Sequence, residues 1–260
     1  MEDYILDAIN YDGFLTDIYD FCPYFKGRGN MVEYYLDGLK GKHLNILELG
    51  TATGSITIPL VASGCSVDTV DYSRDMQNFA RKKAENYGHH VLNKINFILN
   101  DVCCFIPAKT YDAVIIPDSL LTVLPKDKDR EKVLTMCYNA LKDGGLLMFD
   151  VFKPAEKIIQ KQMYQEASRF RDANRNVYIV TVSHRISQCN HLHTCLYDYR
   201  KWPNIKDEGI SIKITYKYLY MVEVEQLLTQ IGFCNIGVKE IFDGHINLVT
   251  AYKLPKNIND

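Results

Sequence analysis

The chain has 260 residues, of which 47% are hydrophobic and 24% are charged, and its formal net charge is −2. This length and apolar content suffice for one large domain with a buried core. The near-neutral charge argues against a nucleic-acid binder, because such proteins usually carry a basic stripe. The densest basic run, Arg81-Lys82-Lys83, is most simply the solvated face of a helix.

Cysteine usage and the N-terminal sequence indicate the compartment. The eight cysteines are scattered without a CxxC pair, and the first residues are acidic and lack the apolar core of a signal peptide. No segment approaches the roughly 20 apolar residues that span a bilayer. We therefore expect a cytoplasmic protein with reduced thiols and no membrane partner.

Strands and helices alternate from Asn45 onward. Short apolar runs predict five strands, and the segments between them carry apolar residues at helical spacing. Gly64 closes the first of these helices and Ser73 caps the second. The predicted strands cover residues 45–50, 66–71, 95–101, 111–118 and 146–152.

This alternation predicts parallel pairing with right-handed crossovers, and therefore a doubly wound sheet. Such sheets bind their ligands at the carboxyl ends of the strands. We expect the ligand near Gly50, Asp71, Asp101 and Asp118, because these residues stand at or near the ends of four predicted strands.

The pattern changes after about Ala173. Three segments then alternate with period two, and no helix separates them, which predicts an antiparallel meander inserted into the parallel fold. The residues before about Lys40 are rich in aromatic side chains and are predicted to be helical. The three alternating segments are 176–187, 191–202 and 210–222, followed by a helix at 222–233 and a closing hairpin at 234–254.

The first strand ends in a glycine turn, Gly50-Thr51-Ala52-Thr53-Gly54. A dinucleotide fingerprint, G-x-G-x-x-G, would place its second glycine at Ala52 and its third at Ser55. The match is poor, which disfavours an NAD-dependent dehydrogenase. An ordinary strand-to-helix turn without a ligand is the other reading of these glycines.

Five sequence elements in order resemble the class I S-adenosyl-L-methionine (SAM)-dependent methyltransferases, in particular the small-molecule members with a Y-D…Y-D opening. Ala52 departs from the middle glycine of their first motif. The elements are the opening 11–20, the motif formed by Glu48, Gly50, Ala52 and Gly54, the acidic Asp71, the pair Asn100-Asp101, and Pro117-Asp118; residues 218–233 also look like their late signature.

The resemblance implies a mostly parallel, seven-stranded Rossmann-like α/β sheet with the antiparallel meander inserted after the fifth strand and an N-terminal helical cap. We expect one domain with four parts. These are the cap at 1–42, the core at 43–172, the inserted lid at 173–221, and the closing helix and hairpin at 222–260.

The resemblance also implies a SAM site. Asp71 can accept both ribose hydroxyls, because a carboxylate has two oxygens. Asp71 could otherwise be a helix N-cap, and Arg28 a surface ion pair, although a guanidinium suits the methionine carboxylate. By resemblance, Glu48 orients the methionine amino group. The other expected contacts are Tyr72 or Met76 on the adenine face, Asp101 and Val102 at its edge, and Tyr11, Gly50, Thr51, Ala52, Gly54 and Pro117 around the cofactor.

Methyl transfer from a sulfonium is an in-line displacement that needs mainly positioning, although a hydroxyl acceptor usually needs a base. The catalytic candidates are Tyr19, Asp118 and His184. A histidine on an apolar strand face is more often a packing residue, and this holds for His184 as well as for His191, His193 and His245. Cys189-x-His191-x-His193 offers metal-ligand types, but one strand cannot close a tetrahedral site, so we expect no metal.

Tyr216, Tyr218 and Tyr220 share one strand face. Core packing is the default for such a stripe, and the alternative is an aromatic wall over a cationic or planar acceptor. The segment 117–120 does not match the NPPY-type motif of enzymes that methylate nucleobases or glutamine amides, which favours a small metabolite. The inserted meander and the N-terminal helices would then cover the pocket and exclude water.

The sequence therefore predicts a SAM-dependent N- or O-methyltransferase of a small molecule, with S-adenosyl-L-homocysteine as product. The alternative is a SAM-binding protein that does not methylate, either a partner subunit or a cyclase. An exposed aromatic face on the meander would also favour a homodimer.

Overall fold

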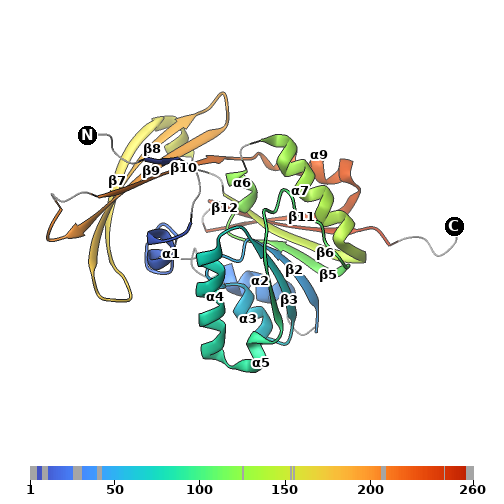
Figure 1. Ribbon diagram of the computed structural model, residues 1–260. Helices are drawn as coiled ribbons and strands as arrows, with labels where there is room; N and C mark the ends of the chain where they lie inside the picture. Colours follow the sequence, from blue (N-terminus) through green and yellow to red (C-terminus); the bar gives the residue numbers. More distant parts are fainter. Residues whose placement is uncertain are drawn as a thin grey trace.

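The computed structural model describes residues 5–7, 11–25, 31–39, 43–124, 126–152, 154, 156–205, 209–242 and 244–255. Figure 1 shows two sheets side by side, a larger one flanked by helices and a smaller one that carries the N-terminal strand. No helix in these ranges is both long enough and apolar enough to cross a membrane.

The larger sheet has seven strands in the order β11-β12-β6-β5-β2-β3-β4. The strands from β6 to β4 pair in parallel, and β12 and β11 add an antiparallel edge, which confirms the predicted fold class and the closing hairpin. The strands are β2 (Asn45–Leu49), β3 (Ser66–Asp71), β4 (Ile95–Leu99), β5 (Tyr111–Ile116), β6 (Leu141–Phe152), β11 (Phe233–Ile241) and β12 (Ile246–Lys253).

Helices cover both faces of this sheet (Figure 1). Ile46 packs in the cluster that includes Tyr35 and Leu60, whereas its neighbour Leu47 packs in the cluster that includes Val133. Strands buried on both faces have continuous apolar runs, which explains why β2 and β5 lack alternation. The helices are α2 (Met31–Leu39), α3 (Thr57–Ala62), α4 (Arg74–Tyr87), α5 (His89–Leu92), α6 (Leu120–Val123), α7 (Asp127–Ala140) and α9 (Met221–Ile231).

The order of the strands creates a switch point. The chain adds β3 and β4 on one side of β2, and then returns to place β5 and β6 on the other side. Ligands of doubly wound sheets bind outside the carboxyl ends of the strands at such a point. The glycine turn after β2 lies there.

The second sheet has the order β1-β10-β9-β8-β7, and helix α8 (Glu156–Lys161) leads into it from β6. The strands β7 to β10 pair antiparallel as predicted, and β1 adds a parallel edge. They are β1 (Ile5–Asp7), β7 (Met163–Arg171), β8 (Val177–Ser187), β9 (Leu192–Trp202) and β10 (Ile210–Lys217).

Two boundaries of this sheet differ from the prediction. The sheet begins at Met163 rather than after residue 172, and the predicted helical N-terminus contributes the strand β1. Strand β7 has one buried side chain, Phe170, so its sequence shows no alternation of apolar and polar residues. Its strand character comes from pairing with β8, a contact that its own pattern does not encode.

The N-terminal segment joins the two sheets. Leu15 and Ile18 of helix α1 (Phe14–Ile18) pack against the apolar face of the second sheet. Just beyond the helix, Asp20 accepts hydrogen bonds from Thr53 at 2.6 Å and from Lys83 at 2.7 Å. The segment is therefore placed to cover the carboxyl edge of the larger sheet.

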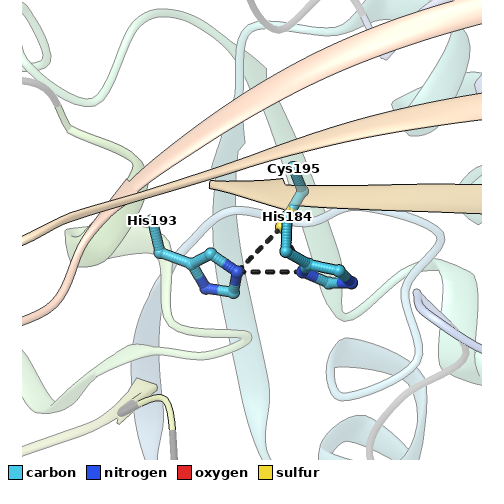
Figure 2. Close-up of side chains that lie close together, drawn as sticks. All are labelled: His184, His193 and Cys195. Atoms are coloured by element: carbon cyan, nitrogen blue, oxygen red, sulfur yellow. Dashed lines mark hydrogen bonds between the residues drawn. The ribbon is translucent and has the colours of Figure 1, made fainter. Parts of the chain in front are cut away.

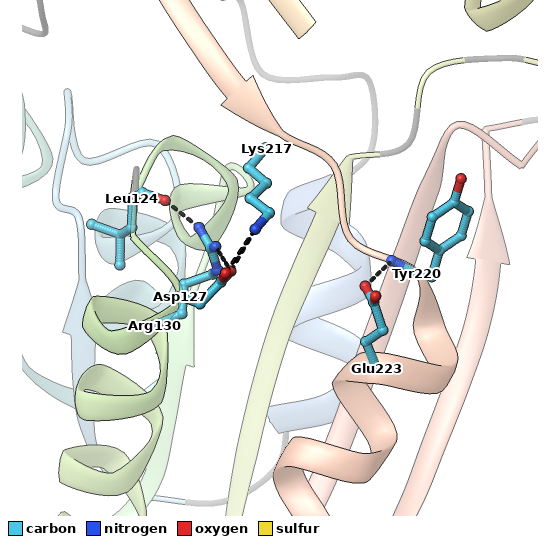
Figure 3. Close-up of polar contacts among 6 residues, drawn as sticks. All are labelled: Leu124, Asp127, Arg130, Lys217, Tyr220 and Glu223. Atoms are coloured by element: carbon cyan, nitrogen blue, oxygen red, sulfur yellow. Dashed lines mark hydrogen bonds and ion pairs between the residues drawn. The ribbon is translucent and has the colours of Figure 1, made fainter. Parts of the chain in front are cut away.

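A polar contact also links β10 to α7 (Figure 3). Lys217 Nζ lies 2.7 Å and 2.8 Å from the two carboxylate oxygens of Asp127, which also accepts from Arg130. Hydrogen bonds from Lys217 and Arg130 hold the pKa of Asp127 below its usual value. Because Asp127 is 75% exposed, this pair contributes about 1 kcal/mol at most to stability and serves mainly to position the end of β10.

Candidate active site

A cavity of about 680 Å³ opens at the carboxyl ends of β2, β3 and β5. Its volume lies in the range of roughly 300–1,000 Å³ that is common for small-molecule sites. The N-terminal segment and Tyr216 of the second sheet form the opposite wall. The predicted site residues that line it are Tyr11, Tyr19, Gly50, Ala52, Asp71, Tyr72, Met76, Asp101, Val102, Pro117 and Asp118.

The glycine turn takes left-handed backbone at three positions. Gly50 has φ +89° and Gly54 has φ +76°, and Ala52 between them has φ +44°. Ala52 therefore adopts the conformation that a glycine would adopt more readily, which explains why this departure from the motif is accommodated. Gly50 and Ala52 line the cavity, whereas Gly54 lies behind it.

Gly54 has a second role in packing. A Cβ on Gly54 would lie 3.1 Å from Ala80 Cβ of α4 and 3.2 Å from Ile58 Cδ1 of α3. The sequence pattern places this glycine in the cofactor motif, and the structure shows that it lets Ala80 and Ile58 pack closely against the turn. Thr51 also supports the turn from behind, because its hydroxyl lies 2.6 Å from the Thr69 hydroxyl.

Replacing Gly54 by alanine is expected to lower the free energy of unfolding more than replacing Gly144. Gly144 has nearly the same backbone, φ +75°, but a Cβ there would meet nothing within 4 Å. Gly144→Ala should therefore cost only the left-handed strain, about 1 kcal/mol. Gly54→Ala should cost roughly 1–2 kcal/mol more, because Ile58 and Ala80 must move. Urea unfolding of both variants measures the difference, and equal losses would contradict the packing role.

Asp71 ends β3 and fastens the glycine turn to it. Its Oδ2 accepts from the Ala52 N–H at 2.9 Å and its Oδ1 from the Ser73 N–H at 2.9 Å. Burial raises the pKa of Asp71, and the two backbone donors oppose that rise. The N-cap of α4 is Ser73, whose Oγ accepts from the Met76 N–H at 3.1 Å, so Asp71 is available to a ligand.

Glu48 lies behind the turn and does not line the cavity. It is fully buried, and Oε2 accepts from the Thr57 hydroxyl. Its Oε1 makes no hydrogen bond with the residues that the structure describes. Burial raises the pKa of Glu48 to about 8, and the charges of Asp118 and Asp71 add to this rise. The carboxyl is therefore mostly protonated at neutral pH.

Tyr19 and Asp118 line the same cavity. The Tyr19 ring stacks on Phe25 at 5.4 Å, and its edge meets Tyr11 at 6.1 Å. Burial, followed by the charge of Asp118, raises the pKa of the Tyr19 hydroxyl well above its usual value. The hydroxyl therefore stays protonated and can donate a hydrogen bond to a ligand.

The loop after β5 is held in strained backbone. Asp118 has φ +56° and Ser119 has φ +55°, which together cost a few kcal/mol, roughly 1–3 each. Asp150 at the end of β6 supports this loop, because it accepts from the Ser119 hydroxyl at 2.7 Å and from the Tyr35 hydroxyl at 2.8 Å. Strained residues at a cavity wall are typical of a ligand site.

The cavity also contains residues that the sequence did not indicate. Asp150 follows the same strand-end rule as Asp71 and could have been found by it. The aromatic residues Tyr24 and Phe25 and the pair Asp129 and Lys132 come from loops and from α7, where no local pattern marks them.

Neither Arg28 nor His184 is among the described residues that line the cavity. Arg28 lies outside the described residues. His184 lies on β8, where its Nε2 is 3.1 Å from Glu166 Oε1 and its Nδ1 is 2.9 Å from His193 Nε2. No histidine in the described ranges lines the cavity, so His184 is not positioned as its base.

The three tyrosines that were predicted to share a strand face do not all line the cavity. Tyr216 lines the cavity, whereas Tyr218 is buried against His191 and Tyr220 is largely exposed. The strand ends at Lys217, so the period of two does not extend to the last two tyrosines.

Comparison with known proteins identifies the central segment. Residues 46–145 match the family described as a methyltransferase domain. This part of the chain, 100 of its 260 residues, is therefore similar to a methyltransferase domain. These residues include the glycine turn, Asp71, Asp101 and Asp118, so the domain supplies most of the cavity wall.

Solved structures extend the likeness beyond the methyltransferase domain. The CcbJ methyltransferase from Streptomyces caelestis superposes with a TM-score of 0.77, covering 93% of this chain and 96% of that chain at 16% identity. CalS10, an amino pentose methyltransferase from Micromonospora echinaspora solved with SAM, superposes with a TM-score of 0.70, covering 88% and 94% at 15% identity. The methyltransferase domain and the second sheet therefore form one fold, the class I methyltransferase fold with an inserted antiparallel sheet.

Similarity detected from sequence alone covers a smaller part of the chain. The carboxy-S-adenosyl-L-methionine synthase of Campylobacter curvus is 26% identical over 162 residues, which is 60% of this chain and 64% of that protein. The chain thus spans less than two thirds of the length of this relative.

Proposed function

We propose that the chain is a SAM-dependent methyltransferase of a small molecule, and that the methyl acceptor is an amine. The observation that carries the proposal is the convergence of Asp71, Asp101 and the glycine turn in one cavity of a methyltransferase domain. The cavity therefore has a cofactor side, at the strand ends, and an acceptor side, under the N-terminal segment.

The residues on the cofactor side fit SAM. An ionised carboxylate has about four acceptor positions, so Asp71 can bind both ribose hydroxyls while it holds the Ala52 N–H. Tyr72 and Met76 line the cavity next to Asp71 and would hold the adenine, with Asp101 as a partner for its edge. The unsatisfied Oε1 of buried Glu48 provides an acceptor for the methionine amino group, reached directly or through water.

The acceptor side is acidic and aromatic. Tyr19 and Tyr216 line it together with Asp118 and Asp150. Aromatic faces and carboxylates attract an amine, and a carboxylate can take the proton that the amine loses. CalS10, which shares this fold, is an amino pentose methyltransferase, so its substrate carries an amine.

Calorimetry with SAM and S-adenosyl-L-homocysteine tests the cofactor. We expect binding of both, and no binding to folded protein at millimolar ligand would overturn the proposal. A methyl-release assay across a panel of amines and matched alcohols tests the acceptor. SAM binding without methyl release would indicate a non-methylating SAM protein, and release with alcohols alone would reject the amine.

Replacing Tyr19 by phenylalanine is expected to lower kcat by about 2- to 13-fold. The change removes one hydroxyl from the acceptor side, and a hydrogen bond of this kind contributes about 0.5–1.5 kcal/mol. SAM affinity should stay nearly constant, because Tyr19 lies away from the cofactor side. Tyr87→Phe, at an exposed position on α4, is the control. An unchanged kcat would remove Tyr19 from the proposed site.

Association through the second sheet remains a prediction. Its edge strand β7 has mostly exposed side chains, including Met163. Light scattering that shows a monomer would reject a homodimer through the inserted meander.

A further inference from the structure

A cluster of nitrogen and sulfur ligands lies in the second sheet, outside the cavity. His184 of β8 pairs directly with Cys195 of β9, and His193 precedes Cys195 by two residues. Because side chains alternate along a strand, all three point to the same face of the sheet. All three are buried. Figure 2 shows both imidazole rings side by side, with the Cys195 sulfur next to them.

The three ligand atoms form a compact triangle. His184 Nδ1 lies 2.9 Å from His193 Nε2, and Cys195 Sγ lies 3.4 Å from each of these nitrogens. Zinc binds histidine nitrogen at about 2.0–2.1 Å and thiolate at about 2.3 Å, which puts ligand atoms of a tetrahedron roughly 3.3–3.6 Å apart. The triangle lies within a few tenths of an ångström of that spacing.

A hydrogen-bonded histidine pair alone would not explain this arrangement. Such a pair needs only the two nitrogens, whereas here a thiol sulfur is equidistant from the same two atoms. Three donor atoms therefore converge on one point, as ligands of one metal ion do.

The surrounding groups fix the rings in this orientation. His184 Nε2 lies 3.1 Å from Glu166 Oε1, and a metal-binding histidine typically donates its other N–H to a carboxylate. Tyr164 stacks on the His184 ring at 4.0 Å, and Phe152 stacks on the His193 ring at 5.9 Å. Both imidazoles are thus held before any ion arrives.

We propose that His184, His193 and Cys195 bind one zinc ion. Binding breaks the S–H bond of Cys195 and releases its proton to solvent, and the thiolate and both neutral imidazoles each donate a lone pair to the ion. Three protein ligands leave the fourth position of the tetrahedron to water. No oxidation or reduction is involved, and the carboxylate of Glu166 compensates the remaining positive charge.

This set differs from the one that the sequence pattern suggested. Cys189 is exposed, with its sulfur 3.4 Å from the Ser187 hydroxyl, and His191 stacks on Tyr218. A single strand indeed cannot close the site, but the pairing of β8 with β9 supplies ligands from two. No metal was predicted from the sequence because all the candidate ligands lay on one strand. The pairing of β8 with β9 removes this objection.

Metal binding is tested on the full chain after treatment with a chelator. Zinc is added, excess ion is removed by gel filtration, and bound metal is measured by elemental analysis. We expect one zinc per chain and a rise in melting temperature, because an ion that binds only the folded state stabilises it. Cobalt in place of zinc should give the absorption of a tetrahedral site with a sulfur-to-cobalt charge-transfer band. No retained zinc, or a cobalt spectrum without sulfur ligation, would overturn the proposal.

Matched variants identify the ligands. Cys195→Ser and His193→Gln are expected to weaken zinc binding by more than about 100-fold, and Glu166→Gln by roughly 10-fold. The double variant Cys189→Ser, His191→Gln should bind zinc like the wild type. Loss of zinc in this control, with retention in Cys195→Ser, would overturn the assignment. Circular dichroism verifies folding. If Cys195→Ser does not fold, the zinc affinity of Glu166→Gln and the cobalt spectrum of the wild type test the proposal instead.

Discussion

Replacing Glu48 by glutamine is expected to stabilise the ligand-free protein increasingly as the pH rises from 4.5 to 8. Burial raises the pKa of Glu48 from 4.5 to about 8, so in this window the folded chain keeps a proton that the unfolded chain releases. The stability contributed by the protonated carboxyl is fully present below pH 4.5 and is lost as the pH rises through 8. The glutamine side chain does not ionise in this pH range, so the variant does not lose stability in this way.

The size of this effect follows from the shift. Each pH unit within the window changes the stability difference by about 1.4 kcal/mol, which gives at most roughly 5 kcal/mol across it. Urea unfolding of both proteins at several pH values measures the difference. Glu85→Gln, at an exposed position on α4, should show no such trend. Parallel stability curves for wild type and Glu48→Gln would contradict the buried, protonated carboxyl.

The same residue should couple cofactor binding to pH. A cationic amino group beside Glu48 favours the ionised carboxyl, so SAM affinity of the wild type should increase as the pH rises toward 8. The Glu48→Gln variant should bind SAM more weakly and lose this dependence. Calorimetry across the same pH range compares the two proteins, and equal slopes would place Glu48 outside the cofactor's reach.

Replacing Asp71 by alanine is expected to weaken binding of SAM and of S-adenosyl-L-homocysteine by about 10- to 100-fold. Hydrogen bonds to a charged group contribute roughly 1.5–3 kcal/mol each, and Asp71 is proposed to accept from the ribose. The change also releases the Ala52 and Ser73 N–H groups, so the glycine turn loses its attachment to β3.

A control on the same strand separates binding from folding. Asp68 of β3 accepts from the Tyr111 hydroxyl at 2.8 Å and does not line the cavity. Asp68→Ala should reduce stability but leave calorimetric affinity for SAM unchanged once folding is verified. If Asp71→Ala binds SAM like the wild type, Asp71 is not a ribose ligand.

The strand-end residues that line the cavity could be predicted from sequence because their positions are set by local rules. Gly50, Asp71, Asp101 and Asp118 stand at or just beyond strand ends, and parallel strands bring their carboxyl ends to one edge. A continuous apolar run identifies each strand, so the positions follow without knowledge of distant contacts. Glu48 was predicted by resemblance to the methyltransferase motif, and its raised pKa depends on burial by the whole fold.

The second sheet was only partly predictable, because its sites depend on which strands pair. Strand β7 lacks an alternating pattern, and only its contact with β8 makes it a strand. Tyr216 lines the cavity while Tyr218 does not, because β10 ends between them.

By itself, the sequence determined the alternation of strands and helices, the glycine turn and the acidic strand ends. Each of these depends on residues within one short segment. Only the tertiary structure decided which residues of the N-terminal segment and the second sheet line the cavity and where His184 points. The register between β8 and β9 places His184 opposite Cys195, eleven residues along the chain, and away from the cavity. Spacing within a strand sets which residues share a face, but pairing between strands sets which of them meet.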